Sequence, residues 1–339
     1  MKRKLASIQK IEKIEPIENA DRIEVASILG WKIVVKKGEF KQGDICVYFE
    51  VDSFLPICPE FEFLRNSSFK KSDILGEGFR IKTQKLRGVI SQGLILPLSI
   101  LPEGNYKIDD DVSEILGVKK WIVPEIEGNL GTIINGFCPY TSKTDEIRIQ
   151  TIPDIIQELK GKPYYISTKM DGTSVTMWSK DGEFHVCGRD SEYKDDEKAV
   201  YWNVARKLNI VDKIKESGLN IAIQGEMCGP KIQKNRLKLT ELHWYVFTIV
   251  DLNTGKRYNL DKLIEFCNIY GLEHVPIEEQ NESFEYTTIE ELLERAKGQY
   301  PSGLAKEGIV IRSLTNDWSK ILNGPLSFKV LNNNFLLKE

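Results

Sequence analysis

The middle of the chain contains the segment Tyr164-Tyr-Ile-Ser-Thr-Lys-Met-Asp-Gly-Thr-Ser-Val-Thr176, around which the rest of the sequence is organised. An apolar, β-favouring run ends at Thr168, Lys169 follows, an Asp-Gly pair turns the chain, and a second β-favouring run begins at Ser174. One interpretation is a plain hairpin with a surface lysine, because Asp-Gly is a strong turn pair. The other is a reactive lysine held on a rigid strand end. The choice depends on whether this lysine has chemical partners downstream.

Four further charged residues lie beside predicted strands of the second half. Arg189 occurs in Gly-Arg-Asp, Glu226 in Gly-Glu-Met, Glu307 in Lys-Glu-Gly-Ile-Val and Lys329 in Ser-Phe-Lys-Val. Each one alone is compatible with a surface salt bridge. Together and in this order they are a strong signal, and any hydrolytic or transfer chemistry is expected to rest on Lys, Arg, Asp and Glu side chains.

Composition limits the classes of protein to consider. A length of 339 residues predicts two domains, and no apolar run approaches the ~20 residues of a membrane helix. The N-terminus lacks a secretory signal, so we expect a cytoplasmic protein. The six cysteines and three histidines are isolated, which argues against a zinc site, a disulfide framework or a histidine-based triad. The net charge of −3 argues against wholesale coating of nucleic acid but permits a local basic groove.

Residues 1–115 are predicted to be all-β. Short β-favouring runs at 23–28, 31–35, 44–49 and 93–97 are separated by turn signals, as in a small barrel. The segment 16–25 resembles the opening of the oligonucleotide-binding (OB) barrel of tRNA-binding domains. Nucleic-acid binding and a purely packing role stay open for it. Candidate contacts are Lys82, Lys85 and Arg87, with Trp31 and Phe79 for stacking.

Residues 116–135 are predicted to be a linker with limited structure, and residues 136–339 a second, α+β domain. Helices are expected to begin at Thr144 and to cover 199–207, 210–215, 261–270 and 288–297. The runs 221–227, 244–251, 308–312 and 326–331 are predicted strands. A basic stretch at 231–238 is either a solvated face or a phosphate contact. The pattern favours antiparallel sheets with flanking helices.

The order of these motifs resembles the covalent nucleotidyltransferase superfamily, which contains ATP-dependent DNA ligases, RNA ligases and mRNA-capping enzymes. The lysine motif Lys-x-Asp-Gly corresponds to residues 169–172, the Gly-Glu motif to Glu226, and the last lysine motif to Lys329. The resemblance implies three sets of site residues: Lys169, Lys329 and Arg189 as catalytic residues, Thr168, Glu226, Phe247 and Gly172 as nucleotide-binding residues, and Glu307 as a metal ligand.

Residues 137–150 resemble the upstream element of bacterial RNA ligases, and the whole chain is most similar to the nick-sealing RNA ligases of the Deinococcus type. The implied fold is an OB-type barrel followed by an adenylyltransferase (ATP-grasp-like ligase) domain. The implied activity is ATP-dependent joining of RNA 3′-OH and 5′-phosphate ends through lysyl-AMP and RNA-adenylate. The implied cofactors are ATP with Mg²⁺ or Mn²⁺, and the implied partner is nicked or broken RNA, duplex or hybrid, bound by a monomer.

The alternatives are a DNA ligase, a capping guanylyltransferase or a non-catalytic tRNA-binding-like module. Only ten residues follow Lys329, where the first two classes carry a second barrel, so we expect the RNA ligase branch. The chain departs from the family's frequent Lys-x-Lys at Ser327. We expect Mg²⁺ and Lys329 to lower the pKa of Lys169, since neighbouring cations disfavour the charged amine. Asp171 is expected to shape the turn.

Overall fold

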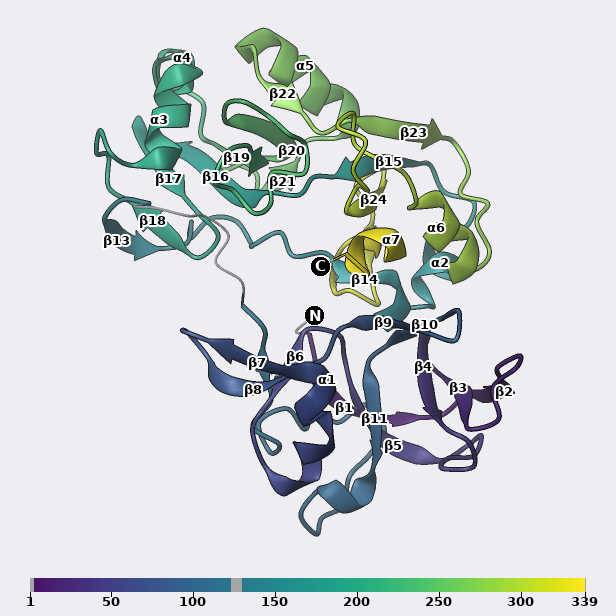
Figure 1. Ribbon diagram of the computed structural model, residues 1–339. Helices are drawn as coiled ribbons and strands as arrows, with labels where there is room; N and C mark the ends of the chain where they lie inside the picture. The colour runs from purple at the N-terminus through teal and green to yellow at the C-terminus, as the bar shows by residue number, and fades with distance from the viewer. Residues whose placement is uncertain (1–2, 123–129, 339) are drawn as a thin grey trace. The chain divides into compact units, whose positions relative to one another are not determined.

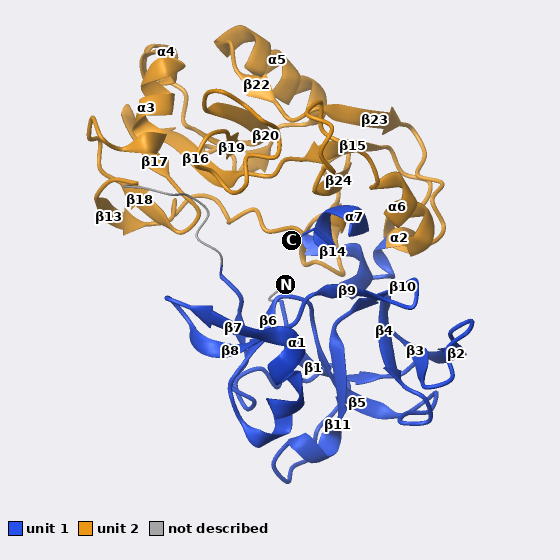
Figure 2. Cartoon of the chain, viewed as in Figure 1, with its two compact units in different colours: residues 1–123, 147–155, 333–339 blue, residues 124–146, 156–332 orange. Residues whose placement is uncertain are grey.

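The computed structural model describes residues 3–122 and 130–338. The chain divides into two compact units, drawn in blue and orange in Figure 2. Unit 1 comprises residues 1–123, 147–155 and 333–339, and unit 2 comprises residues 124–146 and 156–332. The middle of the predicted linker, 123–129, lies outside the described residues. Its described parts contain the short strands β12 (Lys119–Lys120) and β13 (Ile133–Gly136).

Unit 1 is rich in short strands, as the sequence predicts. Its ladders follow the orders β1-β5-β11, β2-β3-β4, β12-β6-β8-β7 and β10-β9. In the part of unit 1 that the structure describes, these ladders are separate small sheets and do not close into one barrel. The remaining bounds are β1 Ala6–Lys10, β2 Lys13–Pro16, β3 Ile23–Ile28, β4 Trp31–Lys36, β5 Ile45–Phe49, β6 Ser53–Leu55, β7 Phe69–Ser72, β8 Gly76–Arg80, β9 Thr83–Leu86, β10 Val89–Gln92 and β11 Leu94–Pro97.

The helical segments of unit 1 are all short. The two aromatic residues that the sequence offered for base stacking are core residues instead: Trp31 is 1% exposed and Phe79 is 0% exposed. Both rings therefore stabilise unit 1, and that part of the prediction is wrong. The bounds are η1 Pro59–Leu64, α1 Arg65–Ser68, η2 Leu98–Ile100, η3 Ile149–Thr151 and α7 Asn333–Leu336, and β14 is Ile147–Arg148.

The described part of unit 2 contains two large, mainly antiparallel sheets (Figure 1) and a two-stranded ladder of β25 and β26. The larger follows the order β13-β18-β17-β16-β19-β20-β21, with β22 added in parallel to β20. In the smaller, β27, β24, β15 and β23 are neighbours in that order. The strands are β15 Tyr164–Lys169, β16 Thr173–Lys180, β17 Glu183–Cys187, β18 Ser191–Tyr193, β19 Ile221–Cys228, β20 His243–Asp251, β21 Lys256–Arg257, β22 Glu273–His274, β23 Ile277–Asn281, β24 Gly308–Ser313, β25 Trp318–Ser319, β26 Gly324–Pro325 and β27 Ser327–Leu331.

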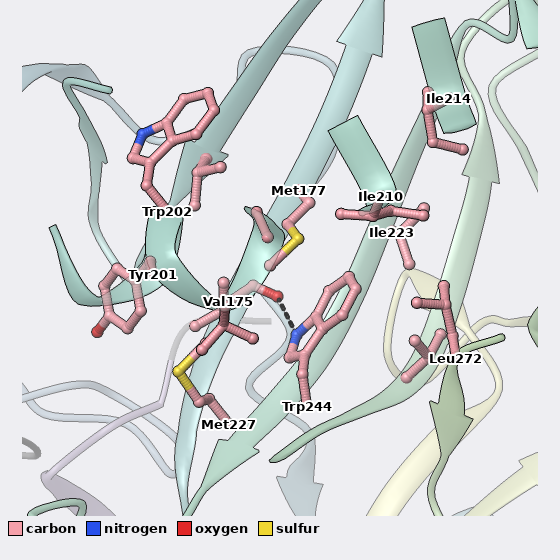
Figure 3. Packing of buried hydrophobic residues seen from close by; sticks show 14 of the residues in the cluster. Val175, Met177, Tyr201, Trp202, Ile210, Ile214, Ile223, Met227, Trp244 and Leu272 are labelled. Atoms are coloured by element: carbon pink, nitrogen blue, oxygen red, sulfur yellow. Dashed lines mark hydrogen bonds between the residues drawn. The ribbon is translucent and has the colours of Figure 1, made fainter. Parts of the chain in front are cut away.

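Amphipathic helices cover the larger sheet. They bury one apolar face against β16, β19 and β20, where the indole of Trp244 is 2% exposed and donates to the Val175 carbonyl at 3.3 Å (Figure 3). Local signals fix the ends of α5: the Asn259 side chain caps its start, and Gly271 adopts φ 65° after its end. The helices that cover this sheet are α3 Val200–Lys207, α4 Ile210–Ser217 and α5 Leu260–Tyr270, and two further helices are α2 Ile155–Leu159 and α6 Ile289–Arg295.

The helix predicted to begin at Thr144 is wrong. Residues 144–146 have no helical structure, although Thr-Asp-Glu has the composition of a helix start. Tertiary contacts outweigh this weak local preference, because Glu146 accepts from Ser327 and Arg312, both at 2.7 Å. None of the helices that the structure describes is long and apolar enough to cross a membrane.

Candidate active site

The turn after Lys169 carries the chain from one sheet of unit 2 to the other. Lys169 ends β15 in the smaller sheet, and β16 of the larger sheet begins at Thr173. In the smaller sheet Lys169 lies opposite Gly308, and Val310 lies opposite Lys329. In the larger sheet Ser174 lies opposite Glu226. Antiparallel register therefore gathers charged residues far apart in sequence around one turn.

A pocket opens between residues of the two sheets. The space between its walls, open solvent included, is about 520 Å³. Five of the predicted site residues line it. The lining comprises Thr144, Asp145, Glu146, Ser167, Thr168, Lys169, Met170, Glu226, Phe247, Val275, Val310, Arg312 and Lys329.

Lys169 is held by Glu307. Its Nζ donates to Glu307 Oε2 at 2.7 Å, and the two side chains are 23% and 18% exposed. The Tyr300 hydroxyl ties the same two residues through their backbones, since it donates to the Lys169 carbonyl at 2.7 Å and accepts from the Glu307 N–H at 3.1 Å. Tyr300 is 4% exposed. The lysine and the acid are therefore fixed as a pair.

The pKa of Lys169 differs from the expectation based on the sequence. Burial alone would lower the pKa of Lys169, but the Glu307 and Glu226 carboxylates outweigh burial and hold the pKa well above its usual value. Lys329, which was expected to lower it, has its own counter-ion: Nζ donates to Asp145 Oδ1 at 2.8 Å. Without bound nucleotide or metal the pKa of Lys169 is raised, so the expected lowering by Lys329 is wrong, whereas the expected effect of Mg²⁺ stays a prediction.

Asp145 joins the two other predicted cationic residues. Its Oδ1 accepts from Lys329, and its Oδ2 lies 3.7 Å from Arg189 Nη2. Arg189 is not among the described residues that line the pocket, but this carboxylate connects it to the lining. The Lys329 side chain is 15% exposed and Arg189 is 44% exposed. Two cations thus converge on one anionic group at the edge of the pocket.

Gly172 lies where no side chain fits. A Cβ there would come within 2.3 Å of the Met227 carbonyl oxygen and 2.7 Å of Cys228 Sγ. The glycine lets the turn pack against β19, and it is not among the described residues that line the pocket. Asp171, beside it, lies 3.3 Å from Arg236 Nε, in agreement with a turn-shaping role.

The Arg312–Glu146 pair was not predicted from the sequence. Arg312 lies in the pocket wall, bonds Glu146 at 2.7 Å and is centred 5.6 Å from the ring of Phe247. Burial alone would raise the pKa of the Glu146 carboxyl, but Arg312 lowers it to about 2. A signal existed: Arg312 is two residues beyond Val310 on β24, so both side chains share one face.

A second missed group lies behind Thr168. Glu278 accepts from Thr168 Oγ1 at 2.7 Å, from Lys306 Nζ at 2.5 and 2.6 Å and from Arg295 at 2.8 Å. Lys306 directly precedes Glu307, so Glu278 connects the strand end that carries Lys169 to the chain that carries Glu307. Burial alone would raise the pKa of Glu278, but these donors hold it below its usual value.

The donor set suits a hard divalent ion. The described residues hold no group of three or more His, Cys, Asp or Glu side chains that could bind a metal. Two carboxylates, Glu226 and Glu307, nevertheless act on the same lysine. Mg²⁺ is commonly bound by one or two carboxylates and keeps several waters, so these two residues fit it.

Profile comparisons match both parts of the chain. The profile of the RNA ligase family matches residues 162–330, and that of an OB-fold domain matches residues 5–98. The segment matched by the RNA ligase profile includes all eight of the predicted site residues. No curated protein sequence matches significantly.

Solved structures of the RNA ligase of Naegleria gruberi are similar over the whole chain. A lysine-to-alanine mutant with ATP and Mn has a TM-score of 0.90 at 35% identity, over 99% of this chain and 99% of that chain. The same ligase with pyrophosphate has a TM-score of 0.90 at 36% identity, over 100% of this chain and 99% of that chain. A glutamate-to-alanine mutant with AMP and Mn has a TM-score of 0.90 at 35% identity, over 99% of each chain. The chain therefore belongs to the RNA ligase family.

Proposed function

We propose that this protein is an ATP-dependent RNA ligase that joins RNA 3′-OH and 5′-phosphate ends at nicks in duplex RNA through an AMP carried on Lys169. The observation that carries the proposal is Lys169 itself. Its side chain lines the pocket between the two sheets, and its amine is paired with Glu307 at 2.7 Å. Glu226 and Lys329 line the same pocket.

In the first step, Lys169 Nζ attacks the α-phosphorus of ATP. A P–N bond forms, the bond to the bridging oxygen breaks, and pyrophosphate leaves. The amine must first leave Glu307 and lose a proton, because only the neutral amine is nucleophilic. Its raised pKa in the free protein makes this an ordered event: the proton leaves once the ligands of the site change the charge around Glu307.

Lys329 and Arg189 are proposed to bind phosphate. Both now face the Asp145 carboxylate, an oxygen anion whose contacts resemble those of a phosphate oxygen. A phosphate that replaced Asp145 would keep both cations paired. Lys329 then faces the α-phosphate, where negative charge develops, and Arg189 holds a phosphate of ATP or of the RNA end.

The nucleoside is assigned to the other wall of the pocket. Glu226 accepts from the ribose hydroxyls, Phe247 stacks on adenine, and the chain around Thr168 contacts the base edge. Phe247 is supported in this role by Arg312, which lies over its ring and donates to its carbonyl oxygen. Gly172 supports the site by letting the turn pack against Met227.

Glu307 is the residue assigned to Mg²⁺ or Mn²⁺. A divalent ion bound there would supply positive charge that stabilises the transferring phosphoryl group and favours the neutral form of Lys169.

In the second step the RNA 5′-phosphate attacks the phosphorus of lysyl-AMP, which frees Lys169 and gives RNA-adenylate. In the third step the 3′-hydroxyl attacks the RNA phosphorus, and AMP leaves. Unit 1, with its OB-fold match, is proposed to hold the RNA during these two steps. We propose a cytoplasmic monomer that resembles the Deinococcus-type ligases in sealing nicks.

The test uses the full chain with ATP, Mg²⁺ and nicked duplexes of all four RNA and DNA strand combinations. We expect rapid sealing of an all-RNA nick and slow sealing of an all-DNA nick. Covalent labelling by GTP in preference to ATP would point to a capping enzyme, and equal sealing of DNA to a DNA ligase. Joining of unpaired RNA ends at the same rate as nicks would overturn the nick-sealing proposal.

A further inference from the structure

The connection between β19 and β20 carries a cluster of basic residues that the nucleotide pocket does not use. We call residues 229–240 the basic loop. Its sequence, Gly-Pro-Lys-Ile-Gln-Lys-Asn-Arg-Leu-Lys-Leu-Thr, contains four cations and no acid. Three of the cations, Lys231, Lys234 and Lys238, are exposed. None of the loop's residues is among those that line the nucleotide pocket.

The backbone of the basic loop adopts a disfavoured conformation. Four of its residues other than glycine are left-handed: Lys231 at φ 64°, Gln233 at 47°, Asn235 at 40° and Lys238 at 55°. Such positions persist only where the surrounding structure enforces them, and they cluster at functional sites. The loop is therefore held in one conformation by its contacts.

Those contacts fasten the basic loop to the turn after Lys169. Arg236 Nε lies 3.3 Å from Asp171 Oδ2, with side chains 9% and 11% exposed. Gln233 Nε2 donates to the Gly172 carbonyl at 3.4 Å. Ile232, 1% exposed, packs in the core of the larger sheet. The buried residues of the loop thus anchor it beside the reactive lysine.

The lysines of the basic loop are on its solvent-exposed side. Ile232 and Arg236 are buried, whereas Lys231, Lys234 and Lys238 point their charges to solvent. Within the described residues, these three lysines make no ion pair. Three unneutralised charges on a rigid support fit a ligand with regularly spaced anions, and rigidity lowers the entropy lost on binding.

We propose that the basic loop binds the phosphate backbone of the RNA strand whose end reaches Lys169. This inference rests on the proposed function. Arg236 acts as a positioning residue, because its pair with Asp171 fixes the loop to the turn that carries the nucleophile. The lysines contact phosphates rather than bases, so the loop contributes affinity without sequence preference.

The experiment compares two triple variants of the full chain. K231A/K234A/K238A removes the exposed charges of the loop. The control K198A/K215A/K256A removes three other exposed charges from segments without a pocket residue, so that net charge is matched. Two readouts are taken: lysyl-AMP formation from ATP and Mg²⁺ without RNA, and the affinity for 5′-adenylated nicked RNA at several salt concentrations. Equal melting temperatures check that both variants fold.

We expect the loop variant to form lysyl-AMP within twofold of the wild type. Its affinity for the nicked RNA falls by about tenfold or more at low salt, and the slope of log affinity against log salt becomes shallower by about two to three. The control keeps both the affinity and the slope. Equal behaviour of the two variants would mean a solvated face and overturn the inference. Loss of lysyl-AMP formation by the loop variant would also overturn it. Failure of the wild type to form lysyl-AMP would instead contradict the proposed function.

Discussion

Two lysine–carboxylate pairs lie next to each other in unit 2, and they differ in how many donors the carboxylate serves. Among the described side chains, Glu307 accepts from Lys169 alone. Glu278 accepts from Lys306, Thr168 and Arg295 together. The Lys169 side chain is 23% exposed and lines the pocket, whereas the Lys306 side chain is 7% exposed. A lysine with one competing partner can be released for chemistry, while a lysine in a saturated, buried network holds the strand ends in place.

The largest effect is expected for the first pair. Glu307→Gln removes the carboxylate assigned to the metal ion but keeps the size of the side chain. The rate of lysyl-AMP formation should fall by at least about a hundredfold, because charge stabilisation of the transferring phosphoryl group is lost. A single-turnover assay with ATP and Mg²⁺ measures it, and the melting temperature should change little. A rate close to that of the wild type would remove Glu307 from the mechanism.

A change in the second pair, Lys306 and Glu278, should lower stability more than it lowers the rate of the reaction. Glu278→Gln leaves Lys306 buried without a counter-ion, so the free energy of unfolding should fall by about 3 kcal/mol. Urea unfolding measures this. Glu294→Gln breaks an exposed pair with Lys297, with side chains 71% and 48% exposed, and serves as the control with a change below about 0.5 kcal/mol. Equal losses in the two variants would contradict the contrast between the pairs.

The pH dependence of stability should report the same network. The pKa of Glu278 is lowered in the folded protein, so its contribution is complete above the ordinary glutamate pKa and is lost as the pH falls through the lower, folded value. The Glu278→Gln variant should therefore lose less of its stability between neutral and acidic pH than the wild type. Parallel stability curves for the two proteins would show that Glu278 is not the titrating group.

The smallest effect is expected at Tyr300, which touches the first pair only through backbone. Tyr300→Phe removes the hydroxyl that bonds the Lys169 carbonyl and the Glu307 N–H. We expect a loss of about 1–2 kcal/mol in stability and a several-fold slower lysyl-AMP formation. Quench-flow kinetics measures the rate of lysyl-AMP formation, and urea unfolding measures the stability. A loss of activity as large as that of Glu307→Gln would mean that the hydroxyl takes part in the chemistry.

Local patterns in the sequence predicted most elements of unit 2. The strand that ends at Lys169, the turn after it, and the helices α3, α4, α5 and α6 agree with the periodicity and the capping signals. The order of charged motifs also identified residues that the structure brings to one pocket, Lys169, Glu226 and Lys329 among them.

What the sequence did not reveal depends on pairings between distant residues. Glu146 and Arg312 are 166 positions apart and meet only after the strands of unit 2 are in register. The raised pKa of Lys169 depends likewise on which carboxylate, Glu307, is placed beside it. Thr144 failed as a helix start because tertiary contacts of the next residues, not local preference, set that backbone.

The central claim is that the lysine with one partner is the one that carries AMP. Full-length protein is incubated with ATP and Mg²⁺, digested and analysed by mass spectrometry, so that the modified residue is located. We predict AMP on Lys169 and none on Lys306, with no covalent AMP in Lys169→Arg. AMP on any other residue, or folded protein that forms no covalent AMP, would contradict the account.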